Sequence, residues 1–306
     1  MSLHVFANFV TPFGTAANNR AETEGNITTL QKLLWMGETH STVSAEAIRF
    51  ALRRRLGESD ATNRTWDEAE RANVWEDHQF KGWATEKGKT FIDDDLLGYM
   101  IAEAAKEEGE AGSANVRRAV LEVTRAVSLT PWPGDVTFNA ASPGATPSAA
   151  KGDKNKSKNP VPYGTELHAT RYQYGIALTP ERLRDKSRAA KAIDALCNLG
   201  TVAGNHGRFL FDFSPDAVVL RITADPAPRL LYCFGTDDDG RTLHAAALMQ
   251  RIKSEDIQAG ELVVGVGDLE SPLAQQLKAA GVQPLGVKAA CAEAVKRINS
   301  ELKIKG

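Results

Sequence analysis

Apolar and polar positions along the chain predict two regular stretches, separated by a more polar middle. Residues 3–10 are rich in β-branched and aromatic side chains, which predicts a first strand. The period then becomes helical, because residues 41–56 place their apolar side chains on one side. Thr42 or Ser44 would cap the start of this helix, and Gly57 would end it. The chain therefore begins with a strand followed by a helix.

The second regular stretch begins near residue 166. Its patterning predicts a strand over 166–178 and a helix over 187–199 closed by Gly200. Further strands are predicted at 209–213, 217–222, 230–234 and 261–266, and further helices at 243–253, 271–280 and 287–302. This order fits an antiparallel or mixed sheet with helices on one face, which is the α+β or ferredoxin-like class.

The middle of the chain is less regular. Residues 58–127 are charged and weakly periodic, which indicates a largely helical or irregular insertion. A strand-like segment at 126–138 is interrupted by Pro131 and Pro133. Residues 142–162 are of low complexity, so we expect this segment to be disordered unless a partner holds it.

Composition narrows the protein class but does not name a partner. The 306 residues are 42% hydrophobic and 25% charged, which excludes a disordered, collagen-like or coiled-coil chain. The net charge of −2 leaves nucleic-acid binding to local patches. Three distant cysteines without a CxxC pair make a zinc site or a disulfide framework improbable. No apolar run reaches the ~18 residues of a membrane span, and the start lacks a basic leader, so we expect a soluble, cytoplasmic protein.

Several motifs that could carry chemistry have simpler explanations. Residues 261–268 resemble a dinucleotide-binding turn, but Glu270 stands where the third glycine is needed. The acidic runs 93–95 and 237–239 favour solvated turns over cation sites, because consecutive carboxylates diverge. The six histidines lack metal spacing and no GxSxG is present. We therefore expect no metal, no cofactor and no catalytic residue.

Basic residues give the clearest alternative between structure and function. Arg49 and Arg53 share one helix face, where they suit a helix C-terminus or would form a row of phosphate contacts. Ser41, Thr42 and Ser44 would add donors at the other end of that helix. A second basic run lies in the low-complexity segment, either solvated or along a nucleic-acid backbone: Lys151, Lys154, Lys156 and Lys158.

Three motifs carry a resemblance to a known family. Residues 25–53, which include Gly-Glu-Thr-His-Ser-Thr-Val-Ser, resemble the segment of that family that contains its first helix. Residues 93–100 are similar to its Asp-x-x-Leu-Phe-Gly-x-Met segment, and 126–142 to the strand that leads into its thumb. Together with 172–216, the resemblance covers about residues 3–235. The family is that of the Cascade backbone subunits of type I CRISPR systems (Cas-seven), in particular its DevR-like type I-B branch.

The resemblance implies a single elaborated domain shaped like a hand. Its palm would be a modified RNA-recognition (ferredoxin-like) fold formed by residues 1–56 and 164–306. A helical fingers insertion would span 58–125, and a β-hairpin thumb would span 128–170.

The resemblance also implies a non-catalytic role. Copies of the chain would line a CRISPR guide RNA and present it in short segments to the target DNA strand. Other partners would be the guide-end cap subunit, the large and small subunits and the repeat-processing endonuclease. One alternative is a metal-dependent, RNA-cleaving backbone subunit of type III kind, disfavoured because residues 11–25 contain no Asp. Another is a DevR-like developmental regulator, for which no helix-turn-helix pattern is present.

Site residues follow from the resemblance by position. Ser44, Arg49 and Arg53 would hold guide phosphates. Met100 would wedge beside a flipped base, a role suited to a flexible apolar side chain. The full set of expected RNA contacts is Asn26, His40, Ser41, Thr42, Ser44, Arg49, Arg53, Met100, Trp132, Lys151, Lys154, Lys156, Lys158, Arg171 and Arg208.

Overall fold

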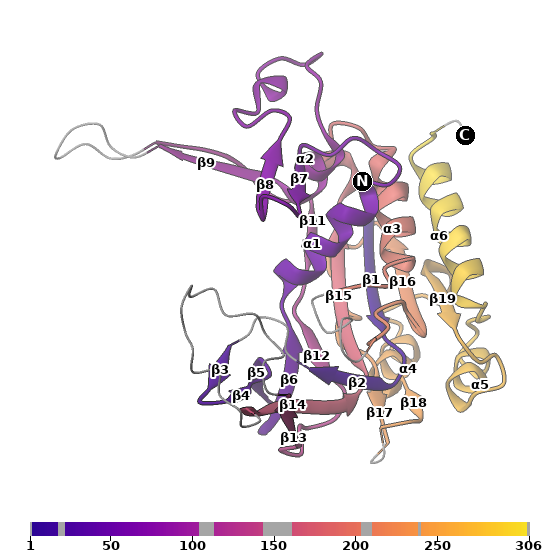
Figure 1. Cartoon of the computed structure of the whole chain (residues 1–306). Helices are drawn as coiled ribbons and strands as arrows, with labels where there is room; N and C mark the ends of the chain where they lie inside the picture. Colours follow the sequence, from indigo (N-terminus) through magenta and orange to yellow (C-terminus); the bar gives the residue numbers. More distant parts are fainter. Residues whose placement is uncertain are drawn as a thin grey trace, which may run out of the picture.

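The computed structural model describes residues 2–17, 22–103, 113–142, 161–202, 210–237 and 240–304. Its centre is one large sheet, with helices packed on it and hairpins extending from it (Figure 1). The strand order is β19-β16-β1-β15-β12-β6-β5, with β11 also paired to β15, and neighbouring strands are antiparallel. The strands are β1 (His4–Val10), β5 (Lys32–Trp35), β6 (Glu38–Val43), β11 (Leu121–Val123), β12 (Ala126–Ser128), β15 (Tyr172–Leu178), β16 (Ala217–Thr223) and β19 (Leu262–Val266).

Both faces of this sheet are covered where β1, β16 and β19 lie. Strand β1 sends Val5, Ala7 and Phe9 to one face and Phe6 and Val10 to the other, and each set joins a separate apolar core. The first core contains α1 (Ala45–Leu56), α3 (Arg188–Cys197) and α6 (Val287–Glu301), and the second contains α4 (Ala246–Lys253) and α5 (Pro272–Ala279). The prediction of helices on one face is therefore wrong, because the C-terminal residues supply a second helical layer.

The insertion after α1 consists mainly of hairpins. Its elements are β7 (Arg64–Asp67), β8 (Ala72–Trp75), η1 (Lys81–Trp83), α2 (Ile92–Leu97), β9 (Tyr99–Glu103) and β10 (Ser113–Arg117). Strand β7 pairs with β8, and the β9–β10 ribbon extends away from the body of the molecule (Figure 1). The prediction of a largely helical or irregular insertion missed these hairpins, since among the described residues of the insertion only η1 and α2 are helical.

A second β layer lies beside the large sheet. It consists of β2 (Gly14–Ala17), β3 (Thr23–Glu24), β4 (Ile27–Thr28), β13 (Val136–Ala141) and β14 (Val161–Thr170). The expected strand at 126–138 is divided between β12 and β13 around Pro131 and Pro133, since proline lacks the amide that a ladder needs. The expected strand at 166–178 is divided at Arg171 into β14 and β15.

Other boundaries differ from the sequence prediction where apolar residues are buried without pairing. Residues 210–213 and 230–234 form no strand, although Phe211, Phe213 and Leu230 are buried. Residues 41–43 belong to β6, so α1 begins later than the pattern predicted. The remaining short elements are η2 (Pro180–Arg182), β17 (Gly235–Thr236), β18 (Leu243–His244) and η4 (Ala259–Glu261).

A disulfide joins Cys197 of α3 to Cys291 of α6, two helices that lie side by side (Figure 1). Cys233 is buried and free. The sequence argued against a disulfide framework and did not predict this single bond, because a separation of 94 residues along the chain says nothing about the distance between packed helices. Among the described residues, no helix is both long and apolar enough to cross a membrane.

Candidate nucleic-acid interface

Helix α1 carries the basic residues that the sequence singled out. It starts where the Ser44 hydroxyl accepts a hydrogen bond from the Ala47 amide, which satisfies one of the free donors of the first turn. Ile48 and Leu52 are fully buried in the core, and they determine which face of the helix is turned toward the sheet. Ser44 therefore acts as the N-cap, one of the two alternatives predicted, and its hydroxyl is already engaged.

Arg49 and Arg53 point from α1 toward α2. Arg49 donates to the Leu97 carbonyl at 2.5 Å, and Arg53 donates to Asp93 at 3.1 Å. Both partners belong to α2. The favourable interaction of cations with the C-terminal end of their own helix therefore does not explain where these two side chains point. Burial, together with the nearby charge of Arg64, lowers the pKa of Arg53 to about 10. The two arginines thus connect α1 to the insertion, close to a third arginine, Arg64.

The acidic run 93–95 forms the first turn of α2 and is buried. Asp93 and Asp94 both accept from Asn63, and Asp95 lies among other donors. Asp93 accepts from Arg53 and the Asn63 and Arg64 amides, Asp94 from the Asn63 carboxamide, and Asp95 from Arg117 and Arg188. The preference for a solvated turn is therefore wrong. Burial and the neighbouring Asp93 raise the pKa of Asp94 to about 7, so near neutral pH this carboxyl carries only about half of a negative charge to offset the arginines.

His40 and Ser41, two expected RNA contacts, are buried within the fold. The Ser41 hydroxyl lies 2.6 Å from His168 Nδ1 and 2.7 Å from the Tyr172 hydroxyl. His40 Nδ1 lies 2.7 Å from the Ser128 carbonyl. Burial lowers the pKa of His168 to about 4, so this histidine is neutral at physiological pH. These side chains hold β6 against β12, β14 and β15, and a direct contact with RNA stays a prediction.

Two further candidates border this region. The Thr42 hydroxyl is within 3.2 Å of the Arg125 guanidinium, which donates to it. The Asn26 carbonyl accepts from the Gly164 amide at 2.9 Å, and this bond fixes the 25–28 turn beside β14. Thr42 is buried and Asn26 is exposed, so Asn26 is the more accessible of the two.

Trp132 lies against the second β layer. Its indole N–H donates to the Leu167 carbonyl at 2.8 Å, and the Lys32 ammonium lies 4.1 Å from its ring centroid. Lys32 also forms an ion pair with Glu166 at 2.7 Å. Trp132 is therefore anchored at the base of the β13–β14 hairpin, and its contact with RNA stays a prediction.

Met100 and Arg171 lie in contrasting environments. Met100 is 69% exposed on β9, across from Val116 of β10, so an apolar side chain on this ribbon is available to a partner. Arg171 is largely buried, pairs with Asp216 at 2.5 Å and donates to the Thr11 carbonyl. Arg171, between β14 and β15, therefore connects this point of the chain to the residues that follow β1 and to those that precede β16.

The chain was compared with known proteins. The family model described as "CRISPR-associated negative auto-regulator DevR/Csa2" matches residues 12–231. The chain belongs to this family. It is 62% identical over 301 residues to the "CRISPR-associated protein Cas7/Cst2/DevR" of Myxococcus xanthus (strain DK1622), and the alignment covers 97% of this chain and 98% of that protein.

Two solved structures have a fold similar to that of this DevR/Csa2-family chain, at low sequence identity. A chain of a "CRISPR RNA-guided surveillance complex, pre-nicking" matches with a TM-score of 0.56 and 14% identity, covering 95% of this chain and 100% of that one. A chain of a "CRISPR RNA-guided surveillance complex" matches with a TM-score of 0.53 and 15% identity, covering 95% and 99%. At these identities the likeness establishes the mixed α/β fold.

Some predicted residues of this DevR/Csa2-family chain lie outside the described residues: Lys151, Lys154, Lys156, Lys158 and Arg208. Among those described, the structure gathers Arg49 and Arg53 and leaves Met100 and Trp132 on separate hairpins. It also adds Arg64 and Trp66 of β7, which sequence reasoning missed. The available indication in the sequence was the presence of Trp66, Trp75 and Trp83, three large aromatic residues within a charged segment.

Within the described ranges, no group of three or more His, Cys, Asp or Glu side chains could hold a metal ion. The three consecutive aspartates of α2 are engaged by protein donors: Asn63 donates to Asp93 and Asp94, and the Asp185 amide donates to Asp95.

Proposed function

We propose that this chain is a non-catalytic, guide-RNA-binding backbone subunit of a type I CRISPR surveillance complex. Family membership and the 62% identical Cas7/Cst2/DevR relative support the assignment, as do the fold matches to chains of RNA-guided surveillance complexes. In this proposal, copies of the chain in the cytoplasm line the guide and present it in short segments to the target DNA strand. The cap, large and small subunits and the repeat-processing endonuclease complete the assembly.

The hand-shaped division into palm, fingers and thumb belongs to the same proposal. Four neighbouring positions of the sheet, in the order β16-β1-β15-β11/β12, are antiparallel, and α1 and α3 pack on the same face. Along the chain these elements run β, α, β, β, α, β, which is the order of a ferredoxin-like or RNA-recognition fold. This order supports a palm of residues 1–56 and 164–306, fingers at 58–125 and a thumb at 128–170.

The observation that carries the proposal is the positive group on α1. Arg49, Arg53 and Arg64 lie near one another, while the adjacent carboxyls are Asp93 and the weakly acidic Asp94. An excess of guanidinium groups at a partly exposed surface favours an anion, and Arg is the side chain best suited to phosphate oxygens. The polyanion that fits the family is RNA.

The test is the salt dependence of RNA binding by the full chain. Replacing both arginines, Arg49→Ala and Arg53→Ala, should weaken binding to all RNA sequences alike. It should also reduce the slope of log K against log salt by about 1.4, at roughly 0.7 per lost phosphate contact on a single strand. Arg55→Ala is the matched control, because Arg55 lies on the same helix but pairs with Glu58. Unchanged affinity and slope in the double variant, with its thermal unfolding intact, would contradict the assignment of these arginines.

Oligomerisation gives a second test. Because one chain covers only a few nucleotides, native mass spectrometry with guide RNA should show several chains on each RNA. Only one-to-one species would count against a backbone role. Incubation with matched RNA and Mg²⁺ should leave the RNA intact, and cleavage would favour the type III alternative.

The family description favours one second candidate, since it names a negative auto-regulator. A regulator would bind duplex DNA upstream of its own gene with sequence preference. Specific duplex binding that exceeds binding to guide RNA would support this candidate over the proposed one.

A further inference from the structure

A pocket of about 300 Å³ lies between the C-terminal half of α1 and the β7–β8 hairpin. Its walls come from two parts of the chain: Phe50, Arg53 and Arg54 from the palm helix, and Arg64 and Trp66 from the insertion. We call it the arginine–tryptophan pocket. Its size lies at the lower end of small-ligand sites.

The pocket brings together three guanidinium groups. Arg53 is mostly buried and is held by Asp93, while Arg54 is exposed. Arg64 is half-buried, and its guanidinium lies 5.4 Å from the Trp75 ring centroid. The carboxylates that line the pocket are Glu58, which pairs with Arg55, and the exposed Glu68. The site therefore carries more positive than negative charge.

The positive charges of these arginines also repel one another. Burial comes first among the causes that lower the pKa of both Arg53 and Arg64, and the charge of a neighbouring arginine contributes to each. A bound anion would relieve this repulsion without moving either side chain. Planar, fixed donors of this kind suit the oxygens of a phosphate group.

The same pocket presents aromatic rings to solvent. Phe50 is 38% and Trp66 37% exposed, with ring centroids 6.3 Å apart and planes at 77°. Such an edge-to-face pair leaves ring surface uncovered. Aromatic surface beside arginines is the combination with which proteins hold single-stranded nucleic acid, since every base has a face to stack.

We infer that the arginine–tryptophan pocket binds one nucleotide of a single strand, with its phosphate on Arg53, Arg54 and Arg64 and its base against Phe50 and Trp66. This inference rests on the proposed function and extends it from the palm helix to the insertion. The strand passes from Arg49 along α1 into the pocket, because Arg49 and Arg53 lie one helical turn apart on the same side.

The two kinds of contact have different signatures in RNA binding by the full chain. Trp66→Ala removes stacking worth about 1–3 kcal/mol per base, so affinity should fall roughly 5- to 150-fold with an unchanged salt slope. Arg64→Gln removes a phosphate contact, so the slope should fall by roughly 0.7. Val74→Ala is the matched control, since Val74 is exposed on the same hairpin and does not line the pocket. It should bind like the unmodified protein.

A second measurement separates lost stacking from a distorted hairpin. An oligouridine strand carrying 5-iodouridine should crosslink to Trp66 on irradiation, and mass spectrometry of the digested protein identifies the site. In a strand with abasic positions, Trp66→Ala and the unmodified protein should bind equally, since no base remains to stack.

The outcomes distinguish this inference from the proposed function. If Arg49→Ala weakens binding while Trp66→Ala does not, and no crosslink forms at Trp66, the pocket assignment is overturned and the RNA-binding role stands. If the unmodified chain binds no RNA at all, the proposed function fails and the pocket assignment fails with it. A crosslink at Trp66 together with the two distinct variant signatures supports the inference.

Discussion

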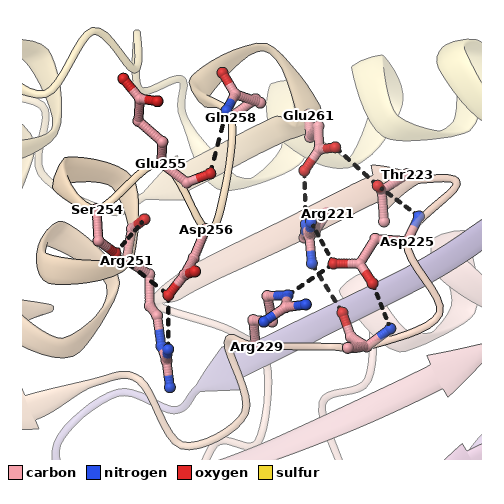
Figure 2. Close-up of polar contacts among 11 residues, drawn as sticks. Arg221, Thr223, Asp225, Arg229, Arg251, Ser254, Glu255, Asp256, Gln258 and Glu261 are labelled. Carbon is pink, nitrogen blue, oxygen red and sulfur yellow. Dashed lines mark hydrogen bonds and ion pairs between the residues drawn. The ribbon is translucent and has the colours of Figure 1, made fainter.

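Arg221 should be the most sensitive polar residue of the C-terminal region. It lies on β16, its side chain is only 2% exposed, and all of its donor nitrogens are bound (Figure 2). Nε donates to Glu261 at 2.7 Å, Nη2 to Asp225 at 3.1 Å and Nη1 to the Ala227 carbonyl at 2.8 Å. One guanidinium thus joins the end of β16 to the following loop and to the start of β19.

The variant Arg221→Ala deletes these three bonds and leaves a void. Hydrogen bonds to charged groups contribute about 1.5–3 kcal/mol each, but their sum overstates the loss. Glu261 and Asp225 are about a quarter exposed, so their carboxylates can recover water once the arginine is gone. We therefore expect the free energy of unfolding to fall by about 3 kcal/mol, near the lower end for breaking a buried ion pair.

Arg229 provides a matched control on the same carboxylate. It donates to Asp225 at 2.7 Å but is exposed, so Arg229→Ala should leave the unfolding midpoint unchanged within error (Figure 2). The assay is urea denaturation of the full chain followed by circular dichroism. Arg221→Met should recover part of the loss, because an apolar side chain fills the space without a charge to solvate. Equal midpoints for Arg221→Ala and Arg229→Ala would refute the argument from burial.

Two further stability predictions concern the large sheet and the helices packed on it. Reducing the Cys197–Cys291 disulfide, which closes a long loop between α3 and α6, should lower stability by about 2–4 kcal/mol in a denaturation assay with and without dithiothreitol. No change on reduction, with mass spectrometry confirming free thiols, would contradict this. Ser41→Ala should cost about 1–3 kcal/mol, because it leaves His168 Nδ1 and the Tyr172 hydroxyl without their shared buried partner, and a neutral result in the same assay would refute it.

Periodic elements with a buried stripe were predictable from the sequence. The helices that became α1, α3, α5 and α6 follow that pattern, and so do β1, β16 and β19. Local chemistry added detail, since Ser44 was one of the two proposed N-caps. The order in which the strands join one sheet was not predicted, because periodicity identifies elements and not their neighbours.

The insertion was harder to predict because its structure depends on pairing between exposed residues. Trp66 and Trp75 lie on facing strands of one hairpin, yet both are partly exposed, so no apolar alternation marks the strands. The aspartates at 93–95 suggested a solvated turn, although donors from distant segments bury them. Composition records how polar a side chain is and not which partner the fold brings to it.

In the candidate site, too, local spacing could be predicted from the sequence and contacts with distant segments could not. The arginine spacing on α1 was visible in the sequence, whereas the burial of Ser41 was not, because its partners lie more than a hundred residues away. Arg64 and Trp66 become candidates only when the β7–β8 hairpin is placed against α1. Sequence reasoning thus identified the arginines of α1 and missed Arg64 and Trp66 on the facing hairpin.

Asp94 should make the stability of the chain depend on pH in a direction unusual for a carboxylate. It is buried beside Asp93, and burial raises its pKa to about 7, whereas an unfolded aspartate titrates near about 3.9. Between these two values the folded state holds a proton that the unfolded state has lost. The free energy of unfolding therefore falls as pH rises from about 4 through about 7, and the contribution of this group is complete only below the lower value.

Asp94→Asn tests this directly, because the amide keeps the shape and an acceptor for the Asn63 carboxamide but cannot ionise. A difference of about 3 pKa units sets a ceiling of about 4 kcal/mol on the effect, and relaxation around the carboxylate reduces it. The variant should therefore gain stability relative to the unmodified protein as pH rises from about 5 to about 8 in urea denaturation. Asp93→Asn is the contrasting variant: Asp93 accepts from Arg53 and two amides, so its loss should destabilise throughout that range. Parallel pH profiles for Asp94→Asn and the unmodified protein would mean that Asp94 is ionised in the fold, and the positive group on α1 would then be better neutralised than its proposed role in phosphate binding requires.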